Sequence, residues 1–130
     1  MSKLINLLII EDNPDDIKII YEILKKSGEF NINFAETLKK AISYLAENDV
    51  DVIFLDLNLP DEIGIRSFVR INNIAKNIPI IIMSGITDKE TIYQVMQKGA
   101  QAYLIKGEVE KDALFRIIHY AIWSRSSNKL

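Results

Sequence analysis

The sequence predicts an α/β fold, a doubly wound parallel sheet with helices on both faces, and two features of its apolar residues predict this class. Apolar runs of strand length recur along the chain without alternating with polar residues, as is typical of strands buried on both faces. Between these runs, apolar residues recur at helical spacing. Five strand–helix repeats follow one another without a linker, so we expect a single domain over residues 1–130.

The expected strands are the apolar runs themselves, which are rich in Ile, Val, Phe and Tyr. Such residues favour strands because their side chains pack well on a pleated surface. In chain order the runs are Leu4 to Ile10, Ile32 to Ala35, Val52 to Leu55, Ile78 to Met83 and Ala102 to Ile105. The second run gives the weakest signal.

The first expected helix has signals at both ends. Asn13 is a suitable N-cap, and Pro14 suits the first helical position, where its missing N–H costs nothing. Asp15 and Asp16 fall in the first turn, where negative charge favours the positive end of the helix dipole. The core-facing stripe consists of Ile17, Ile20, Ile23 and Leu24. Gly28 then stops the helix.

Four further helices are expected, each from a stripe or a terminal signal. The second has Leu38, Ala41, Ile42 and Leu45, and the less regular third has Ile65, Phe68, Val69 and Asn72. The fourth opens at Thr87-Asp88-Lys89-Glu90, which resembles a capping box, and Gly99 ends it. The fifth carries Leu114, Ile117, Ile118, Ala121 and Ile122. We expect the core to span about residues 4–123 and residues 124–130 to form a polar tail.

Composition excludes several classes of protein. The chain has no cysteine, which excludes disulfides and thiolate metal sites, and its single histidine, His119, excludes a multi-histidine zinc site. A formal net charge of −2 gives no electrostatic reason to expect nucleic acid as a partner. No apolar stretch approaches the roughly 18 residues of a membrane span. The N-terminus suits a first strand better than a signal peptide, so we expect a cytoplasmic protein without a membrane partner.

The polar residues that directly follow the apolar runs are the candidates for function. Glu11-Asp12 follows the first run and Asp56 the third, while Ser84-Gly85 and Lys106-Gly107 follow the fourth and fifth. Open parallel sheets bind ligands beyond the carboxyl ends of their strands. These residues can therefore lie together on one edge of the sheet.

Carboxylates gathered on one edge repel one another. Two unit charges about 4 Å apart cost on the order of 4 kcal/mol at an effective dielectric near 20. Lys106 supplies one offsetting charge, and a divalent cation would supply two; an all-oxygen site with several carboxylates suits Mg²⁺. A metal beside a carboxylate and a lysine can handle a phosphoryl group, so Asp56 is a candidate nucleophile that forms an aspartyl phosphate.

Four motifs carry a family resemblance, which covers the chain from about Leu4 to Ile122. They are IIED ending at Glu11-Asp12, FLDLNLPDEIG around Asp56, IIMSG at Ser84-Gly85, and GAQAYLIKG from Gly99 to Gly107. Each motif is weak alone, but their order and spacing are highly specific. The chain resembles the receiver domain of response regulators in two-component signalling. Among these, it resembles the single receivers that are like the chemotaxis regulator. The resemblance implies the flavodoxin-like strand order 2-1-3-4-5.

The resemblance also implies a phosphoacceptor and a metal site. Asp56 would accept the phosphoryl group. Asp12, Asp56 and the backbone carbonyl of Asn58 would ligate Mg²⁺, with Glu11 acting largely through coordinated water. Glu11 is a mild departure, because the family more often has Asp at this position.

A second group of residues would respond to the phosphoryl group. By resemblance, Ser84 hydrogen-bonds a phosphoryl oxygen, and Lys106 ion-pairs with it. Tyr103 occupies the place of the aromatic residue whose rotamer follows the Ser84 hydroxyl. Gly107 departs from the family, which usually has Pro after the lysine. A cis peptide before a non-proline residue costs about 2.5–4 kcal/mol, so we expect a trans bond between Lys106 and Gly107.

The function implied is a phosphorylation-controlled signalling domain rather than a metabolic enzyme. It would take its phosphoryl group from a histidine kinase or a phosphotransfer protein. Its output would leave through the face made by the fourth helix, fifth strand and fifth helix, as a homodimer contact or a contact with a downstream protein. The chain would act by direct protein contact or as the leading piece of a longer protein. Candidate residues on that face are Tyr93, Gln97, Tyr103 and Phe115.

Other functions fit the sequence less well. A phosphatase of the haloacid-dehalogenase kind needs a second Asp two residues after its nucleophile, and Asn58 stands there. A Ser-His hydrolase lacks its G-x-S-x-G elbow. A pseudo-receiver that binds partners without phosphorylation would not need the intact acidic residues, Ser84 and Lys106.

Residues outside the motifs have simpler interpretations. Asp61 and Glu62 suit a solvated loop, and His119 suits a surface position without chemistry. The aromatic residues of the last helix are open to two interpretations, ordinary packing or a patch that faces a partner. They are Phe115, Tyr120 and Trp123.

Overall fold

The computed structural model describes residues 3–85 and 88–127. Its main sheet has five parallel strands: β1 (Ile5–Ile10), β2 (Phe30–Ala35), β3 (Val52–Leu55), β6 (Ile80–Ser84) and β7 (Ala102–Ile105). The helices are α1 (Pro14–Lys25), α2 (Leu38–Glu47), α3 (Ile65–Ile74), α4 (Lys89–Gln97) and α5 (Lys111–Ser127). The strands lie in the order β2-β1-β3-β6-β7, which confirms the predicted class and strand order.

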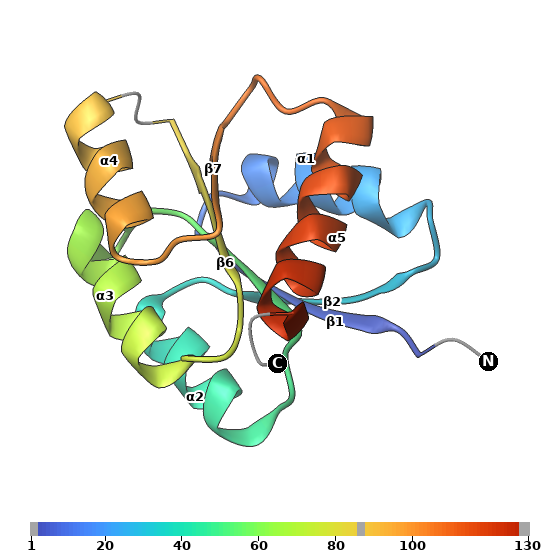
Figure 1. Ribbon diagram of the computed structural model, residues 1–130, viewed down its shortest axis with the longest axis horizontal. Coiled ribbons are helices and arrows are strands. Elements are labelled where there is room, and N and C mark those ends of the chain that lie inside the picture. The colour runs from blue at the N-terminus through green and yellow to red at the C-terminus, as the bar shows by residue number, and fades with distance from the viewer. Residues whose placement is uncertain (1–2, 86–87, 128–130) are drawn as a thin grey trace.

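Helices lie on both faces of the sheet (Figure 1), and on each face an apolar layer lies between the sheet and the helices. Alternate strand residues point to opposite faces, so Leu8 and Ile53 join one layer while Leu7 and Val52 join the other. Helices α2, α3 and α4 pack on the first face, and α1 and α5 pack on the second. Burial on both faces explains why the strand runs carry no polar alternation. None of the described helices combines the length and the apolar character needed to cross a membrane.

The predicted N-terminal helix signals are confirmed at α1 and shifted at α4. The Asn13 side chain accepts hydrogen bonds from the backbone of Asp15 and Asp16, and Pro14 begins the helix. At α4 the N-cap is Asp88, whose carboxylate accepts from the Glu90 amide. The capping box predicted from Thr87 was therefore placed one residue early; Thr87 itself lies outside the described residues.

Helix α5 continues further than the sequence predicted. The polar residues that follow Ile122 were expected to form a tail, but the helix extends to Ser127. Arg125 explains part of this difference, because its guanidinium donates a hydrogen bond to the Lys76 carbonyl 3.1 Å away. A contact with another part of the fold thus holds the last turn, and the local sequence does not reveal that contact.

A small hairpin after β3 was not predicted. Strands β4 (Asn58–Leu59) and β5 (Glu62–Ile63) pair antiparallel, and Asp61 lies in the turn between them. The Asp61 carboxylate accepts hydrogen bonds from the Leu38 amide at 2.9 Å and the Lys39 amide at 3.0 Å, the first two amides of α2. Asp61 is exposed, as predicted, but the interpretation as a merely solvated loop was wrong because its carboxylate joins this hairpin to a helix.

Candidate functional site

Backbone hydrogen bonds hold the candidate residues at the carboxyl edge of the sheet. The Glu11 amide donates to the Ala35 carbonyl, the Asp56 amide to the Ile10 carbonyl, and the Lys106 amide to the Ser84 carbonyl, each at 3.0 Å. Each bond continues the parallel ladder one residue past the end of a strand. The positions of these backbones therefore follow from the register of the sheet.

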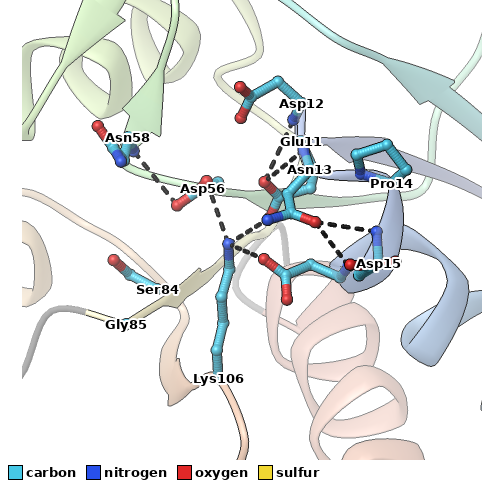
Figure 2. Close-up of a pocket in the computed structure, with 11 residues that line it drawn as sticks. Glu11, Asp12, Asn13, Pro14, Asp15, Asp56, Asn58, Ser84, Gly85 and Lys106 are labelled. Carbon is cyan, nitrogen blue, oxygen red and sulfur yellow. Dashed lines mark hydrogen bonds and ion pairs between the residues drawn. The ribbon is translucent and has the colours of Figure 1, made fainter.

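This edge gathers most of the buried polar side chains. Glu11, Asp56, Ser84 and Ser67 are the buried polar or charged residues of the described chain, and the first three lie here. Glu11, Asp56 and Ser84 line a cavity of about 910 Å³. Asp12, Asn58, Gly85 and Lys106 line it as well. Figure 2 shows the Lys106 side chain pointing into the space between Asp56 and Glu11. The structure thus brings together the residues that the sequence singled out at the strand ends.

Lys106 is the positive centre of the cluster. Its Nζ lies 2.6 Å from Glu11 Oε1, 2.8 Å from Asp16 Oδ2 and 3.2 Å from Asp56 Oδ2. Burial lowers the pKa of Lys106, but hydrogen bonds to Asp16 and Glu11 and the charge of Asp56 outweigh that effect and hold the pKa above its ordinary value. Lys106 is therefore charged throughout the physiological range.

Glu11 is the carboxyl most affected by the crowding. Burial, followed by the hydrogen bond to Asp56, raises the pKa of Glu11 to about 7 despite the attraction of Lys106. Its Oε2 also accepts hydrogen bonds from the amides of Asp12 and Asn13, both at 3.2 Å. Both Glu11 oxygens thus have protein partners, an arrangement that suits support of the site better than a direct bond to a metal.

The acidic residues fit a divalent cation. Oxygen atoms of Glu11, Asp12 and Asp56 lie within 4.8 Å of one another, and Asp12 is exposed to the cavity side. Carboxylate oxygens with room for water are the ligands that Mg²⁺ and Ca²⁺ take. Asn58 lies on the cavity wall, and its amide donates to Asp56 Oδ1 at 3.2 Å. Its predicted role, a metal ligand through the backbone carbonyl, stays a prediction.

Ser84 and Tyr103 are in contact. Ser84 is buried at the end of β6, and Tyr103 is partly buried in the neighbouring strand β7. Burial raises the pKa of the Tyr103 hydroxyl, and the hydrogen bond between Tyr103 and Ser84 opposes that rise. A hydrogen bond therefore joins the two side chains across neighbouring strands. Their roles as a switch stay predictions.

The loop after Lys106 confirms the trans bond expected at Gly107. The described chain contains no cis peptide. Gly107 has φ +86°, a left-handed conformation that residues with a Cβ rarely adopt. The Glu108 amide closes the turn by donating to the Ile105 carbonyl at 3.1 Å. Glycine thus serves a backbone requirement here.

Two aspartates make contacts in the structure that the sequence did not predict. The sequence placed Asp15 and Asp16 together as a helix-dipole pair, and both do lie in the first turn of α1. Asp15 is exposed, whereas Asp16 reaches Lys106. Asp61, which accepts from the first two amides of α2, is the second. Neither contact has a local signal, because the partners lie 90 and 23 residues away along the chain.

Phe115 does not lie on the predicted output face. Its ring stacks on that of Phe30 at 6.1 Å between centroids, on the side of α5 next to β2. Strand β7 lies at the opposite end of the sheet. Packing is thus the correct interpretation for Phe115, whereas Tyr120 and Trp123 are well exposed. His119 is a half-exposed surface residue, 3.2 Å from Glu29.

Comparison with known proteins identifies the family. Residues 7–119 match the response regulator receiver domain. The cell cycle transcriptional regulator CtrA of Caulobacter vibrioides is 34% identical over 117 residues, which cover 89% of this chain and 49% of CtrA. A receiver domain protein from Clostridium thermocellum is 26% identical, with a TM-score of 0.84 over 98% of this chain and 100% of that one. The chain thus spans about half the length of CtrA.

A third comparison shows the fold alone. A response regulator from Burkholderia pseudomallei, whose crystal structure contains a phosphorylated aspartic acid and a calcium ion, has a TM-score of 0.78 at 18% identity. The match covers 96% of this chain and 72% of that one.

The chain belongs to the response regulator receiver domain family. It is a phosphoacceptor module of two-component signalling, phosphorylated on an aspartate, rather than a metabolic enzyme. Domains of this family bind a divalent cation at the acidic site and interact with a cognate histidine kinase. The phosphatase alternative is thereby excluded.

Proposed function

We propose that Asp56 is the phosphoacceptor and that the cation beside it is Mg²⁺. The observation that carries this is the position of Asp56: its carboxylate is buried, lies 3.2 Å from Lys106, and shares an oxygen cluster with Glu11 and Asp12. In the transfer, an Asp56 oxygen attacks phosphorus, and the bond from phosphorus to the donor's leaving group breaks. The leaving group departs with the electron pair of that bond.

Each neighbour of Asp56 has a distinct task in this proposal. Asp12, Asp56 and the Asn58 carbonyl hold the cation, and Glu11 supports it through water. When bound, the cation supplies positive charge to the oxygens of the transferring group. Lys106, already charged, offsets negative charge at the same place.

The direct test is phosphorylation by a small donor. Acetyl phosphate and Mg²⁺ are added to the full chain, and its intact mass is measured. We expect one added phosphoryl unit, carried by the peptide that contains Asp56 and absent when EDTA replaces Mg²⁺. Asp56→Asn should stay unlabelled. Asp51→Asn, at the other end of β3, is the matched control and should be labelled like the parent. An unlabelled parent would sink the proposal in favour of a pseudo-receiver, and a labelled Asp56→Asn would place the phosphoryl group on another residue.

The second part of the proposal concerns the signal. The phosphoryl group draws the Ser84 hydroxyl to itself, which changes the environment of its partner Tyr103. A ligand shifts a two-state element only by interacting differently with its two states, and this hydrogen bond is such a difference. We expect Ser84→Ala to be phosphorylated but to show a smaller NMR shift at Tyr103. Equal shifts in the variant and the parent would contradict this role.

The output surface in this proposal is the face of α4, β7 and α5, used by a second copy or a downstream protein. Tyr93 and Met96 on α4 and Tyr120 on α5 are exposed there. A mostly apolar hollow of about 330 Å³ lies between β7 and α5 beside Tyr120. Amide exchange with and without beryllofluoride, which mimics the phosphoryl group, should change in residues 88–106. Changes confined to the loops around Asp56 would show that the output lies elsewhere.

The upstream partner is proposed as a histidine kinase or a phosphotransfer protein of the cytoplasm. Membership of the receiver domain family supports contact with a histidine kinase. A phosphorylated donor would approach the acidic edge of the sheet, where Asp12 is exposed. Transfer from a candidate kinase can be followed with radiolabelled ATP. Asp56→Asn should block it.

A further inference from the structure

The Lys106 ammonium already lies close to as many carboxylates as it has N–H donors. An ammonium carries three N–H donors. In this structure three carboxylates lie within reach of Nζ, those of Glu11, Asp16 and Asp56. A phosphoryl group on Asp56 brings new oxygens to the same place. If Lys106 is to bind one of them, one of its present partners must give way.

Of the three carboxylates, that of Asp16 can be released from Lys106 at the lowest cost in free energy. Its side chain is 29% exposed, against 6% for Glu11 and 5% for Asp56, so its carboxylate recovers hydration most easily when it is released. Glu11 is also held by backbone amides. Asp56 itself would carry the phosphoryl group. Asp16 comes from the first turn of α1, outside the ends of the strands.

We propose that Asp16 competes with the phosphoryl group for Lys106. In the resting site the ammonium is shared with Asp16, and on phosphorylation it passes to a phosphoryl oxygen. Asp16 is thus a positioning residue that acts through Lys106 and weakens the hold of the site on the phosphoryl group. This inference rests on the proposed phosphorylation of Asp56.

The opposite role for Asp16, supporting the contact between Lys106 and the phosphoryl group, predicts the opposite change in affinity. If Asp16 served to aim Lys106 at the phosphoryl group, removing its charge would weaken binding. Damage to the fold would weaken binding as well. Only competition predicts that loss of the Asp16 charge strengthens binding, so the sign of the change decides.

The experiment is a titration of the full chain with beryllofluoride, followed by amide shifts in NMR spectra. Asp16→Asn keeps the shape and an acceptor oxygen but loses the charge. Asp15→Asn is the matched control, with the same change one residue away, on an exposed side chain for which the structure shows no Lys106 contact. Mg²⁺ is held at saturation for each protein, as determined by a separate titration, so that metal affinity does not enter.

We expect Asp16→Asn to bind beryllofluoride on the order of five-fold more tightly than the parent, the scale of one partly exposed ion pair. Asp15→Asn should stay within about two-fold. In a Lys106→Met background, the gain from Asp16→Asn should fall to within about two-fold, because the shared partner is gone.

Three results would overturn the inference: equal affinities for the two Asn variants, weaker binding by Asp16→Asn, or an undiminished gain without Lys106. A parent that binds no beryllofluoride at saturating Mg²⁺ would instead overturn the proposed function, and this inference with it. Normal binding by the parent with any of those three results leaves the proposed function standing and removes only the role of Asp16.

Discussion

The two edges of the sheet hold charge in different ways. At the carboxyl edge, the carboxylates of Glu11, Asp16 and Asp56 surround one ammonium, that of Lys106, and Asp12 lines the same cavity. At the amino edge, a cavity of about 490 Å³ is lined by two acidic and two basic residues, Asp49, Asp51, Lys3 and Arg125. The first edge has an excess of negative charge, and the second is balanced.

Hydrogen bonding follows the same division. At the amino edge, Asp51 accepts from the Asn6 amide at 2.8 Å, and the Asn6 side chain accepts from Asn31 at 3.0 Å. At the carboxyl edge, one ammonium group is shared among three carboxylates, and the pKa of Glu11 is raised to about 7. The balanced edge is structural, whereas the unbalanced edge is arranged for a cation and a phosphoryl group at some expense in stability.

The largest expected effect is a difference in sign between the edges. Without metal, Asp56→Asn should raise the free energy of unfolding by about 2 kcal/mol, because it removes a buried charge from a repelling cluster. Asp51→Asn should lower it by about 0.5 kcal/mol, because the Asn6 amide loses a charged acceptor. Urea unfolding in EDTA measures both. Changes of the same sign would mean that charge balance does not distinguish the edges.

The next effect is stabilisation by Mg²⁺. At a free concentration about ten times the dissociation constant, Mg²⁺ should raise the free energy of unfolding by about 1.4 kcal/mol. Asp12→Asn should lose most of this gain, and Asp51→Asn should keep it. The measurement is urea unfolding with and without Mg²⁺. An equal loss in both variants would place the ion outside the acidic cluster.

The hairpin beside the carboxyl edge provides a third test. Asp61→Ala should lower the free energy of unfolding by about 1 kcal/mol, because two amides of α2 lose their acceptor. Although burial opposes it, hydrogen bonds from Leu38 and Lys39 hold the pKa of Asp61 below its ordinary 3.8. The contribution is therefore complete above that value and is lost as pH falls through the lower folded pKa.

Urea unfolding of the parent and of Asp61→Ala over a range of pH checks this sign. The gap between the two proteins should be constant at neutral pH and should close below about pH 4. A gap that widens in acid would show that the two amides are not the source of the stabilisation.

The smallest expected effect tests whether stability depends on the unbalanced charge of the carboxyl edge or merely on an acidic residue near it. Glu62 also lies on the hairpin, but it pairs with Arg70 at 3.3 Å, and the arginine side chain is largely exposed. Glu62→Gln should change the free energy of unfolding by less than about 0.5 kcal/mol. A change as large as that of Asp56→Asn would show that any acidic residue near this edge has the same effect.

Local rules were enough for most of the fold and for the backbone positions of the site. The strands at Val52–Leu55 and Ala102–Ile105 have the predicted bounds, and α1 begins at Pro14 as its cap requires. Apolar runs, caps and strand ends depend on residues that are near in sequence. The polar residues that follow the strands therefore pointed to the correct edge, where the structure brings Asp56, Ser84 and Lys106 together.

Local rules could not predict contacts between segments that are far apart in the sequence. The hairpin held by Asp61, the last turn of α5 and the packing of Phe115 on Phe30 all depend on partners far away in the chain.

The two neighbouring aspartates of α1 show the reason. The sequence by itself determined that both lie in the first turn of a helix that follows the first acidic strand end. Which one reaches Lys106 depends on how the helix is rotated about its axis. Packing of Ile20 and Leu24 against the sheet sets that rotation, because consecutive helical residues point about 100° apart. Only the tertiary structure decided that Asp16, and not Asp15, enters the site.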